Sequence, residues 1–315
     1  MLKLNLKKSV MLAGIPKGQK CGHPAPRMAS FELSMQPGFR QPLPTYSGET
    51  MKQTPKALFL SHGGGPLPLL GDSAHQEMIS CLKSIAASIP KPDALVVVSA
   101  HWEEKNPTIT SGQSPFLIYD YHGFSPESYQ IQYPCPGEPF LASELHRMLA
   151  DAGIDARQDE SRGIDHGVFV PLKIMYPEAN IPCVQMSLVD TLDPSHHIEI
   201  GRALKNLSRK NVLVIGSGFS FHNMRAFFTP DDEESNRLNH SFEDWLVNVC
   251  SSREIREEER AGLLIRWSKA PGARFCHPRE EHLLPLHVCY GVAQSPSSEQ
   301  YRTVIMNKES SLYLW

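Results

Sequence analysis

The most strand-like stretch of this sequence is Ala94–His101, which reads ALVVVSAH. A short apolar run bounded by polar and proline-containing segments is typical of a β-strand buried on both faces. Two comparable runs, Ala57–Leu60 and Val212–Ile215, are followed by His62 and His222, respectively. The sequence therefore predicts three buried strands, each with a histidine at or beyond its carboxyl end.

Strands buried on both faces are typical of parallel sheets, which place their functional sites outside the carboxyl ends of the strands. The strand-end histidines could therefore converge there. A neutral imidazole open to a crevice is a good ligand for zinc or iron. Any one of these histidines could instead simply hydrogen-bond a loop. Because His62 and His101 lie at equivalent strand ends, a shared metal site and separate loop contacts are equally good interpretations of this pair.

Strand and helix patterns alternate from residue 55 onward, without a linker or an internal repeat. We expect strands at Ala57–Leu60, Ala94–Ala100, Cys183–Leu188 and Val212–Ile215, and helices at Asp72–Ile89, Phe140–Gly153, His196–Ser208 and Ser241–Val249. A loop around Pro278 leads into a further apolar segment, Leu283–Val292. This alternation predicts an α/β fold: a single domain with a central, mostly parallel sheet, mixed at its edges and flanked by helices.

The composition is that of an ordinary globular protein, with 41% hydrophobic and 21% charged residues among 315. A net charge of -3 predicts no attraction to nucleic acid or membrane, and no apolar stretch is long enough to span a bilayer. The seven cysteines are scattered and never spaced as CxxC. This favours reduced thiols in the cytoplasm over a disulfide framework or a zinc ribbon.

Residues 1–54 differ from the rest, because six Lys/Arg and no Asp/Glu occur up to Arg27. We expect a disordered extension, or sequence upstream of a start at Met51, ahead of a catalytic domain spanning 55–315. An organelle transit peptide is the alternative, which the small number of Arg and Ser residues disfavours.

Further candidate site residues lie in Asp165-His166-Gly167, Phe221-His222-Asn223 and Glu280-Glu281-His282. Simpler interpretations exist for the acidic residues. Asp165 could cap a helix, and the glutamates could form a solvated first helical turn.

Several ordered motifs together resemble one family. They are His62-Gly63-Gly64, Val97–Trp102, Tyr133–Gly137, Asp165-His166-Gly167, Met175-Tyr176-Pro177, Gly216-Ser217-Gly218, His222-Asn223 and Pro278–Leu286. The series is similar to class III extradiol ring-opening dioxygenases of the DOPA 4,5-dioxygenase type, over roughly residues 55–315.

The resemblance implies an enzyme with a mononuclear Fe(II) site, in which His62 and His101 are ligands and His282 is the third. Glu281 is the alternative third ligand, because many extradiol enzymes use a carboxylate there. His222 matches a base or an additional ligand, and His166 matches a histidine that faces the substrate. The implied reaction opens the ring of a DOPA-like catechol with O2.

One departure concerns the substrate. Plant members of the family have a His-Pro-based stretch where this chain has His222-Asn223-Met224-Arg225, so DOPA itself is not assumed. Two other functions stay open: a zinc-dependent hydrolase that activates water with the same histidines, and a non-catalytic metal-binding or interaction protein on this fold.

Overall fold

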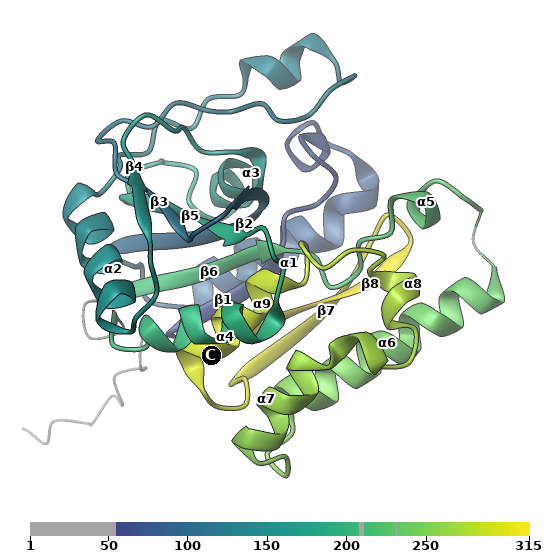
Figure 1. The fold of residues 1–315 in the computed structure, drawn as a ribbon. Helices are drawn as coiled ribbons and strands as arrows, with labels where there is room; N and C mark the ends of the chain where they lie inside the picture. The colour runs from purple at the N-terminus through teal and green to yellow at the C-terminus, as the bar shows by residue number, and fades with distance from the viewer. Residues whose placement is uncertain (1–54, 208–210, 231) are drawn as a thin grey trace, which may run out of the picture. The chain divides into compact units, whose positions relative to one another are not determined.

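The computed structural model describes residues 55–207, 211–230 and 232–315. The expectations for residues 1–54, and for a helix end at Ser208, concern residues outside these ranges. One eight-stranded sheet forms the centre, in the order β4-β3-β5-β2-β6-β1-β8-β7 (Figure 1). The strands are β1 (Ala57–Ser61), β2 (Ala94–Glu104), β3 (Thr108–Thr110), β4 (Arg157–Asp159), β5 (Cys183–Val189), β6 (Val212–Gly218), β7 (Glu299–Ile305) and β8 (Lys308–Leu314).

The middle of the sheet is parallel and its flanks are mixed. Strands β5, β2, β6 and β1 run parallel to one another, and their side chains are almost entirely buried. β8 pairs antiparallel with β1, and β3 pairs antiparallel with β5. The predicted fold class is therefore confirmed. The continuous apolar runs of the sequence form the central parallel strands, which are buried on both faces.

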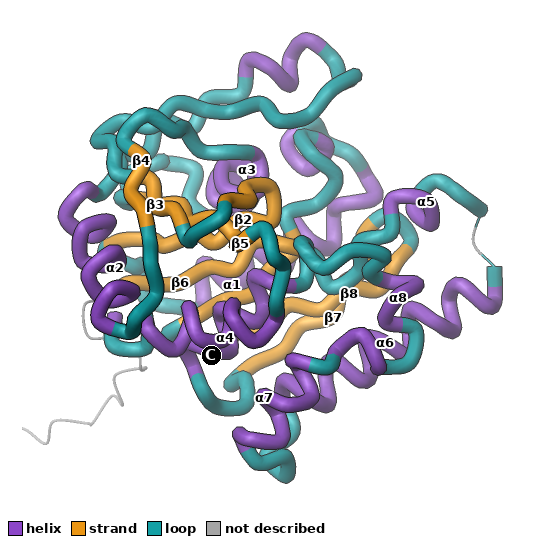
Figure 2. The backbone as a smooth tube through the Cα atoms, in the orientation of Figure 1, coloured by secondary structure: helices purple, strands orange, loops and turns teal. Residues whose placement is uncertain are grey.

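Helices cover both faces of the sheet, as Figures 1 and 2 show. They are α1 (Gln76–Ser88), α2 (Pro139–Asp151), α3 (His166–Met175), α4 (Pro194–Ala203), α5 (Met224–Phe227), α6 (Glu233–Ser251), α7 (Glu257–Ile265), α8 (Ala273–Cys276) and α9 (Leu284–Ala293). None of the helices in the described ranges is long and apolar enough to cross a membrane.

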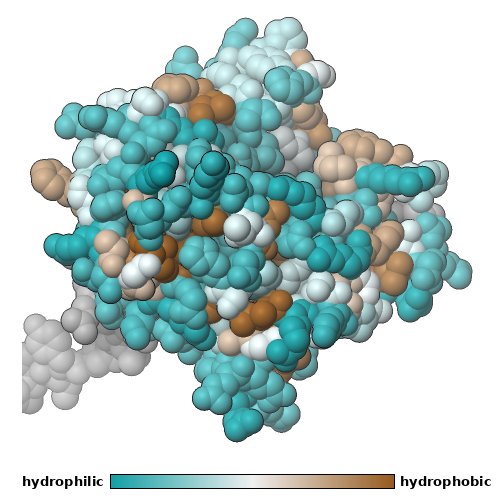
Figure 3. All heavy atoms as spheres, viewed as in Figure 1, coloured by the Kyte–Doolittle hydropathy of each residue, from teal (hydrophilic) through white to brown (hydrophobic). Residues whose placement is uncertain are grey.

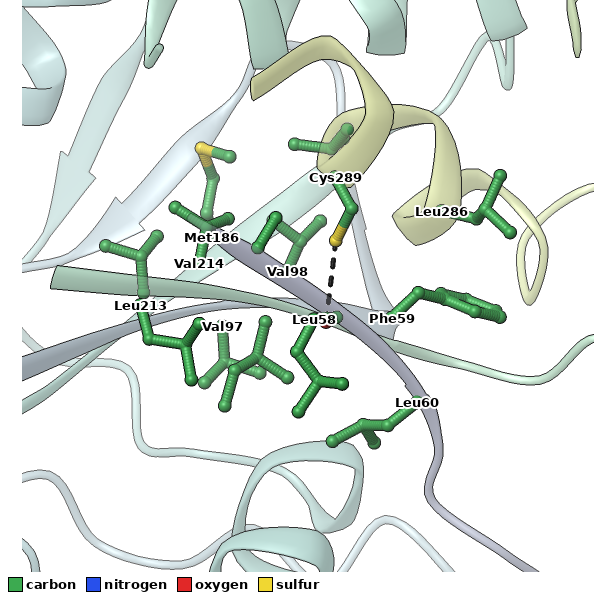
Figure 4. Packing of buried hydrophobic residues seen from close by; sticks show 14 of the residues in the cluster. Leu58, Phe59, Leu60, Val97, Val98, Met186, Leu213, Val214, Leu286 and Cys289 are labelled. Carbon is green, nitrogen blue, oxygen red and sulfur yellow. Dashed lines mark hydrogen bonds between the residues drawn. The ribbon is translucent and has the colours of Figure 1, made fainter. Parts of the chain in front are cut away.

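Helix α9 lies directly on the parallel strands, and α4 packs on its outer side. Figure 4 shows Cys289 of α9 pointing toward β1, and its thiol donates to the Leu58 carbonyl at 3.5 Å. A Cβ on Gly291 would lie 2.3 Å from the Ile198 carbonyl oxygen, so the contact between α4 and α9 requires glycine. The apolar segment after Pro278 is thus a buried helix that fixes the preceding loop against the sheet.

Several elements differ from the sequence expectations. The helix expected at Ser241–Val249 is the end of the longer α6, whose first turn is capped by Asp232 accepting from the Ser235 amide at 2.9 Å. The β7–β8 hairpin was not predicted, because its two-residue turn is Met306-Asn307 and not the usual Asn-Gly or Asp-Gly. This hairpin supplies the antiparallel flank of the sheet.

Candidate active site

Five histidines from five separate segments line one pocket of about 290 Å³. His62 follows β1, and His101 lies within β2 near its carboxyl end. His166 is the first residue of α3, His222 lies between β6 and α5, and His282 lies in the turn before α9. The structure therefore brings together all the histidines that the sequence singled out as candidate ligands or catalytic residues.

His62, His101 and His282 form the innermost group, each offering one ring nitrogen within 4.8 Å of the others. The Nε2 atoms of His62 and His101 are 3.0 Å apart. The Nε2 atom of His282 is buried and has no hydrogen-bond partner among the described residues. Buried polar atoms normally have a partner, so an unpartnered nitrogen beside two other imidazoles indicates a binding place for a group that accepts its lone pair, such as a metal ion.

The proton on His62 can be located from its neighbour Ser217. The Ser217 hydroxyl donates its only proton in a short hydrogen bond to the Gly167 carbonyl. Its oxygen, 3.1 Å from Nδ1 of His62, can therefore only accept, so Nδ1 carries the imidazole proton. The Nε2 lone pair of His62 then faces the pocket.

Carboxylates favour the same tautomer in the other imidazoles. Asp120 accepts from Nδ1 of His166 at 2.8 Å and lies 3.5 Å from Nδ1 of His101. Glu281 accepts from Nδ1 of His282 at 3.0 Å and lies 3.5 Å from Nδ1 of His222. Each pocket histidine therefore has an oxygen acceptor beside Nδ1, which is how proteins orient imidazoles that bind metals.

The inner group fits a metal ion. With both Nδ1 atoms protonated, the Nε2 lone pairs of His62 and His101 face each other, and a shared cation would satisfy both. The two Nε2 atoms are 3.0 Å apart, close enough for one ion to bind both.

Burial keeps these three imidazoles neutral. It lowers the pKa of His62 and His282 well below the ordinary value, and neighbouring histidines add to the effect. Burial, assisted by His166, also lowers the pKa of His101 to about 3, although Asp120 opposes the shift. A neutral imidazole is the form that binds a metal, so the site needs no deprotonation at neutral pH.

Glu281, the alternative third ligand, contacts the Nδ1 side of His282 and His222, which faces away from the inner group. Besides its contacts with His282 and His222, it lies 3.4 Å from the guanidinium of Arg279, which in turn pairs with Glu103 at 2.5 Å. The rings of His222 and His282 are stacked, with centroids 3.3 Å apart and 11° between their planes. Glu281 therefore lies behind a pair of imidazoles and is only slightly exposed, unlike a solvated first helical turn.

Glycines in β6 allow the His282 segment to reach the sheet. A Cβ on Gly216 would lie 2.5 Å from the Pro285 carbonyl oxygen, and one on Gly218 would lie 2.1 Å from that of His282. The His282 carbonyl also accepts from the Phe219 amide at 2.9 Å. The Gly-Ser-Gly sequence thus serves close backbone packing beside the site.

Asp165 does not cap α3 with its side chain, as the sequence had suggested it could. Its buried carboxylate accepts from the Ser99 hydroxyl at 2.7 Å and from the Gln185 amide. These contacts tie the start of α3, and hence His166, to β2 and β5.

Sequence reasoning missed Ser217 and Asp120 as orienting groups. Ser217 had a signal, because it is a polar residue near the end of a buried strand, where it pairs in register with Leu60, two residues before His62. Asp120 had none, since it lies in a loop 46 positions before His166.

The chain is similar in sequence and fold to known proteins. A model of the catalytic LigB subunit of aromatic ring-opening dioxygenase matches residues 56–310. A protein of Hapsidospora irregularis named dioxygenase tasH is 40% identical, over 78% of this chain and 80% of the relative. The 4,5-DOPA dioxygenase extradiol of Beta vulgaris is 35% identical, over 81% of this chain and 91% of its own. A crystal structure of an uncharacterized Escherichia coli K12 protein aligns with a TM-score of 0.65 and 29% identity, over 82% of this chain and 98% of that one.

Proposed function

Because the chain belongs to the LigB family of aromatic ring-opening dioxygenases, we propose that it opens a side-chain-bearing catechol of the DOPA type with O2, using Fe(II). The proposed ligands are Nε2 of His62, His101 and His282. The observation that carries this assignment is the orientation of the three rings, whose unprotonated nitrogens face one point in a pocket. Family membership itself implies a metal-dependent dioxygenase, and the identity of the metal is our inference.

Bound Fe(II) would supply coordination positions for the catechol and O2 and the electron transfer between them. The protein's part is to move protons and exclude water. His166 has its Nδ1 proton held by Asp120, so its Nε2 can accept a catechol hydroxyl proton, and the carboxylate stabilises the resulting imidazolium. The His166 imidazolium can return this proton to a developing oxygen anion, and His222, stacked on His282, can serve as a second base.

Zinc binds the same donor atoms but has no redox chemistry, so it could support only a hydrolase. Iron is favoured over zinc by the family and not by the donor atoms, because ring opening with O2 requires a redox-active metal.

The test is anaerobic reconstitution with Fe(II) or Zn(II), followed by addition of DOPA, caffeate, protocatechuate or the uncharged 4-propylcatechol in air-saturated buffer. We expect O2 uptake and a yellow semialdehyde with iron alone. His62→Ala and His101→Ala should lose both iron and turnover, whereas His122→Ala, which changes an exposed histidine, should keep both. Absence of O2 uptake with every catechol would refute the proposal, and retained iron in both ligand variants would refute the ligand assignment.

A further inference from the structure

Beyond its histidines, the pocket wall is apolar. Phe219 and Phe227 line one side, and Leu67, Phe124 and Met306 contribute to the rest. These residues come from the segment after β6, from α5, from a short 3-10 helix (Leu67–Leu69), from the loop that carries Phe124 and from the β7–β8 turn. The part of the pocket that would surround a ring substituent is therefore built from aromatic and thioether surface.

No Lys, Arg, Asp or Glu is among the described residues that line this pocket. Asp120 and Glu281 lie behind the imidazoles that they orient. The hydroxyl of Tyr121, a further lining residue, is already used, because it donates to the Ser128 carbonyl at 2.6 Å. A charged substituent inside the pocket would lose its hydration without gaining an ammonium, guanidinium or carboxylate partner from the described lining residues, which is unfavourable.

The apolar surface continues outward at the pocket rim. Met224 and Phe228 line the pocket yet are 53% and 72% exposed. Figure 3 shows a light brown, apolar patch on the surface over α5. Large apolar side chains that stay exposed together beside a cavity are typical of a binding surface.

Met306 closes the wall at a conformational cost. Its φ of 51° is in the left-handed region, which disfavours a residue with a long side chain. Its sulfur lies 3.1 Å from the position that a Cβ on Gly64 would take, so it packs against the glycine loop after His62. The two-residue β7–β8 turn requires this left-handed conformation, and the turn holds the Met306 side chain at the pocket wall.

From these observations we propose that the catechol carries an uncharged, apolar side chain, which Met224, Phe228 and Met306 contact. This inference rests on the proposed function. It departs from DOPA, whose side chain carries both an ammonium and a carboxylate group.

The first test compares two catechols of similar shape on the Fe(II) enzyme: 4-propylcatechol and 3-(3,4-dihydroxyphenyl)propionate. We expect kcat/KM to be at least about tenfold higher for 4-propylcatechol, the discrimination expected when a charge must be desolvated. Met224→Arg should move the preference toward the carboxylate by about tenfold. Met224→Leu, the matched control, should leave the preference unchanged.

The second test needs no metal. Metal-free protein is titrated with 4-propylphenol and with 3-(4-hydroxyphenyl)propionate, and binding is followed by saturation-transfer NMR. Tighter binding of 4-propylphenol supports the inference even if no catechol is opened, a result that would refute only the proposed function. Equal or tighter binding of 3-(4-hydroxyphenyl)propionate overturns the inference, and so does faster turnover of 3-(3,4-dihydroxyphenyl)propionate. Neither result would contradict the proposed ring opening.

Discussion

The hydroxyl of Ser217 lies between the Gly167 carbonyl and Nδ1 of His62, and it can donate only to the carbonyl. Ser217 therefore fixes the proton of His62 on the side away from the pocket. This single contact connects strand β6, helix α3 and the end of β1 at the candidate metal site.

Replacing Ser217 by alanine should weaken iron binding by about 10- to 100-fold, the usual effect of removing a group that orients a metal-bound histidine. Titration of the metal-free protein with Fe(II) under nitrogen measures this. Ser61→Ala is the matched control, because the Ser61 hydroxyl is buried on β1 but has no hydrogen-bond partner among the described residues. Equal affinities for both variants would show that Ser217 has no orienting role.

Asp120→Asn should lower kcat by about 10- to 100-fold with a smaller effect on KM, because the His166 imidazolium would lose its negatively charged partner. Stopped-flow and steady-state assays at several pH values would separate proton transfer from binding. Glu160→Gln changes an exposed carboxylate and should have no effect. An unchanged kcat with reduced iron content would assign Asp120 to His101 and metal retention instead.

Gly216→Ala should destabilise the protein by about 1–3 kcal/mol, since the new methyl group would overlap the Pro285 carbonyl. It should also weaken metal binding, because relief of the overlap moves the segment that carries His282. Gly262→Ala in α7 would meet only the flexible end of Arg266 and should be neutral or slightly stabilising. Urea unfolding combined with iron titration checks both effects, and a stable Gly216→Ala variant with normal affinity would contradict the packing argument.

The burial of Glu243 predicts that the free energy of unfolding depends on pH. It is fully buried in α6 and accepts from the Ser311 hydroxyl at 2.5 Å, and burial raises its pKa from 4.5 to about 7. Because the folded-state pKa is the higher one, its stabilising contribution is complete below pH 4.5. That contribution decreases as the pH rises, by about 3 kcal/mol above pH 7.

Glu243→Gln should remove this dependence, so the stability difference between the two proteins should change by about 3 kcal/mol between pH 4.5 and pH 8. Urea unfolding of both proteins across this range measures the difference. Parallel curves would show that Glu243 titrates normally.

The sequence predicts the buried strands and the two strand-end histidines well, because apolar runs such as Val96–Val98 report burial directly. It could not place His282 beside them by pattern alone, since that position depends on how α9 packs across β6. The loop carboxylate Asp120 was also beyond prediction, because only the tertiary fold brings it to His166. Polar contacts between distant loops leave no periodic signal in a sequence.

The innermost histidines also have a consequence for folding. His62 and His282 are about 220 residues apart in the chain, so an ion bound by both would close a very long loop, and such closure restricts the unfolded ensemble. An ion there would act as a reversible cross-link between the end of β1 and the turn before α9. Resistance to heat and proteases should then rise with metal occupancy.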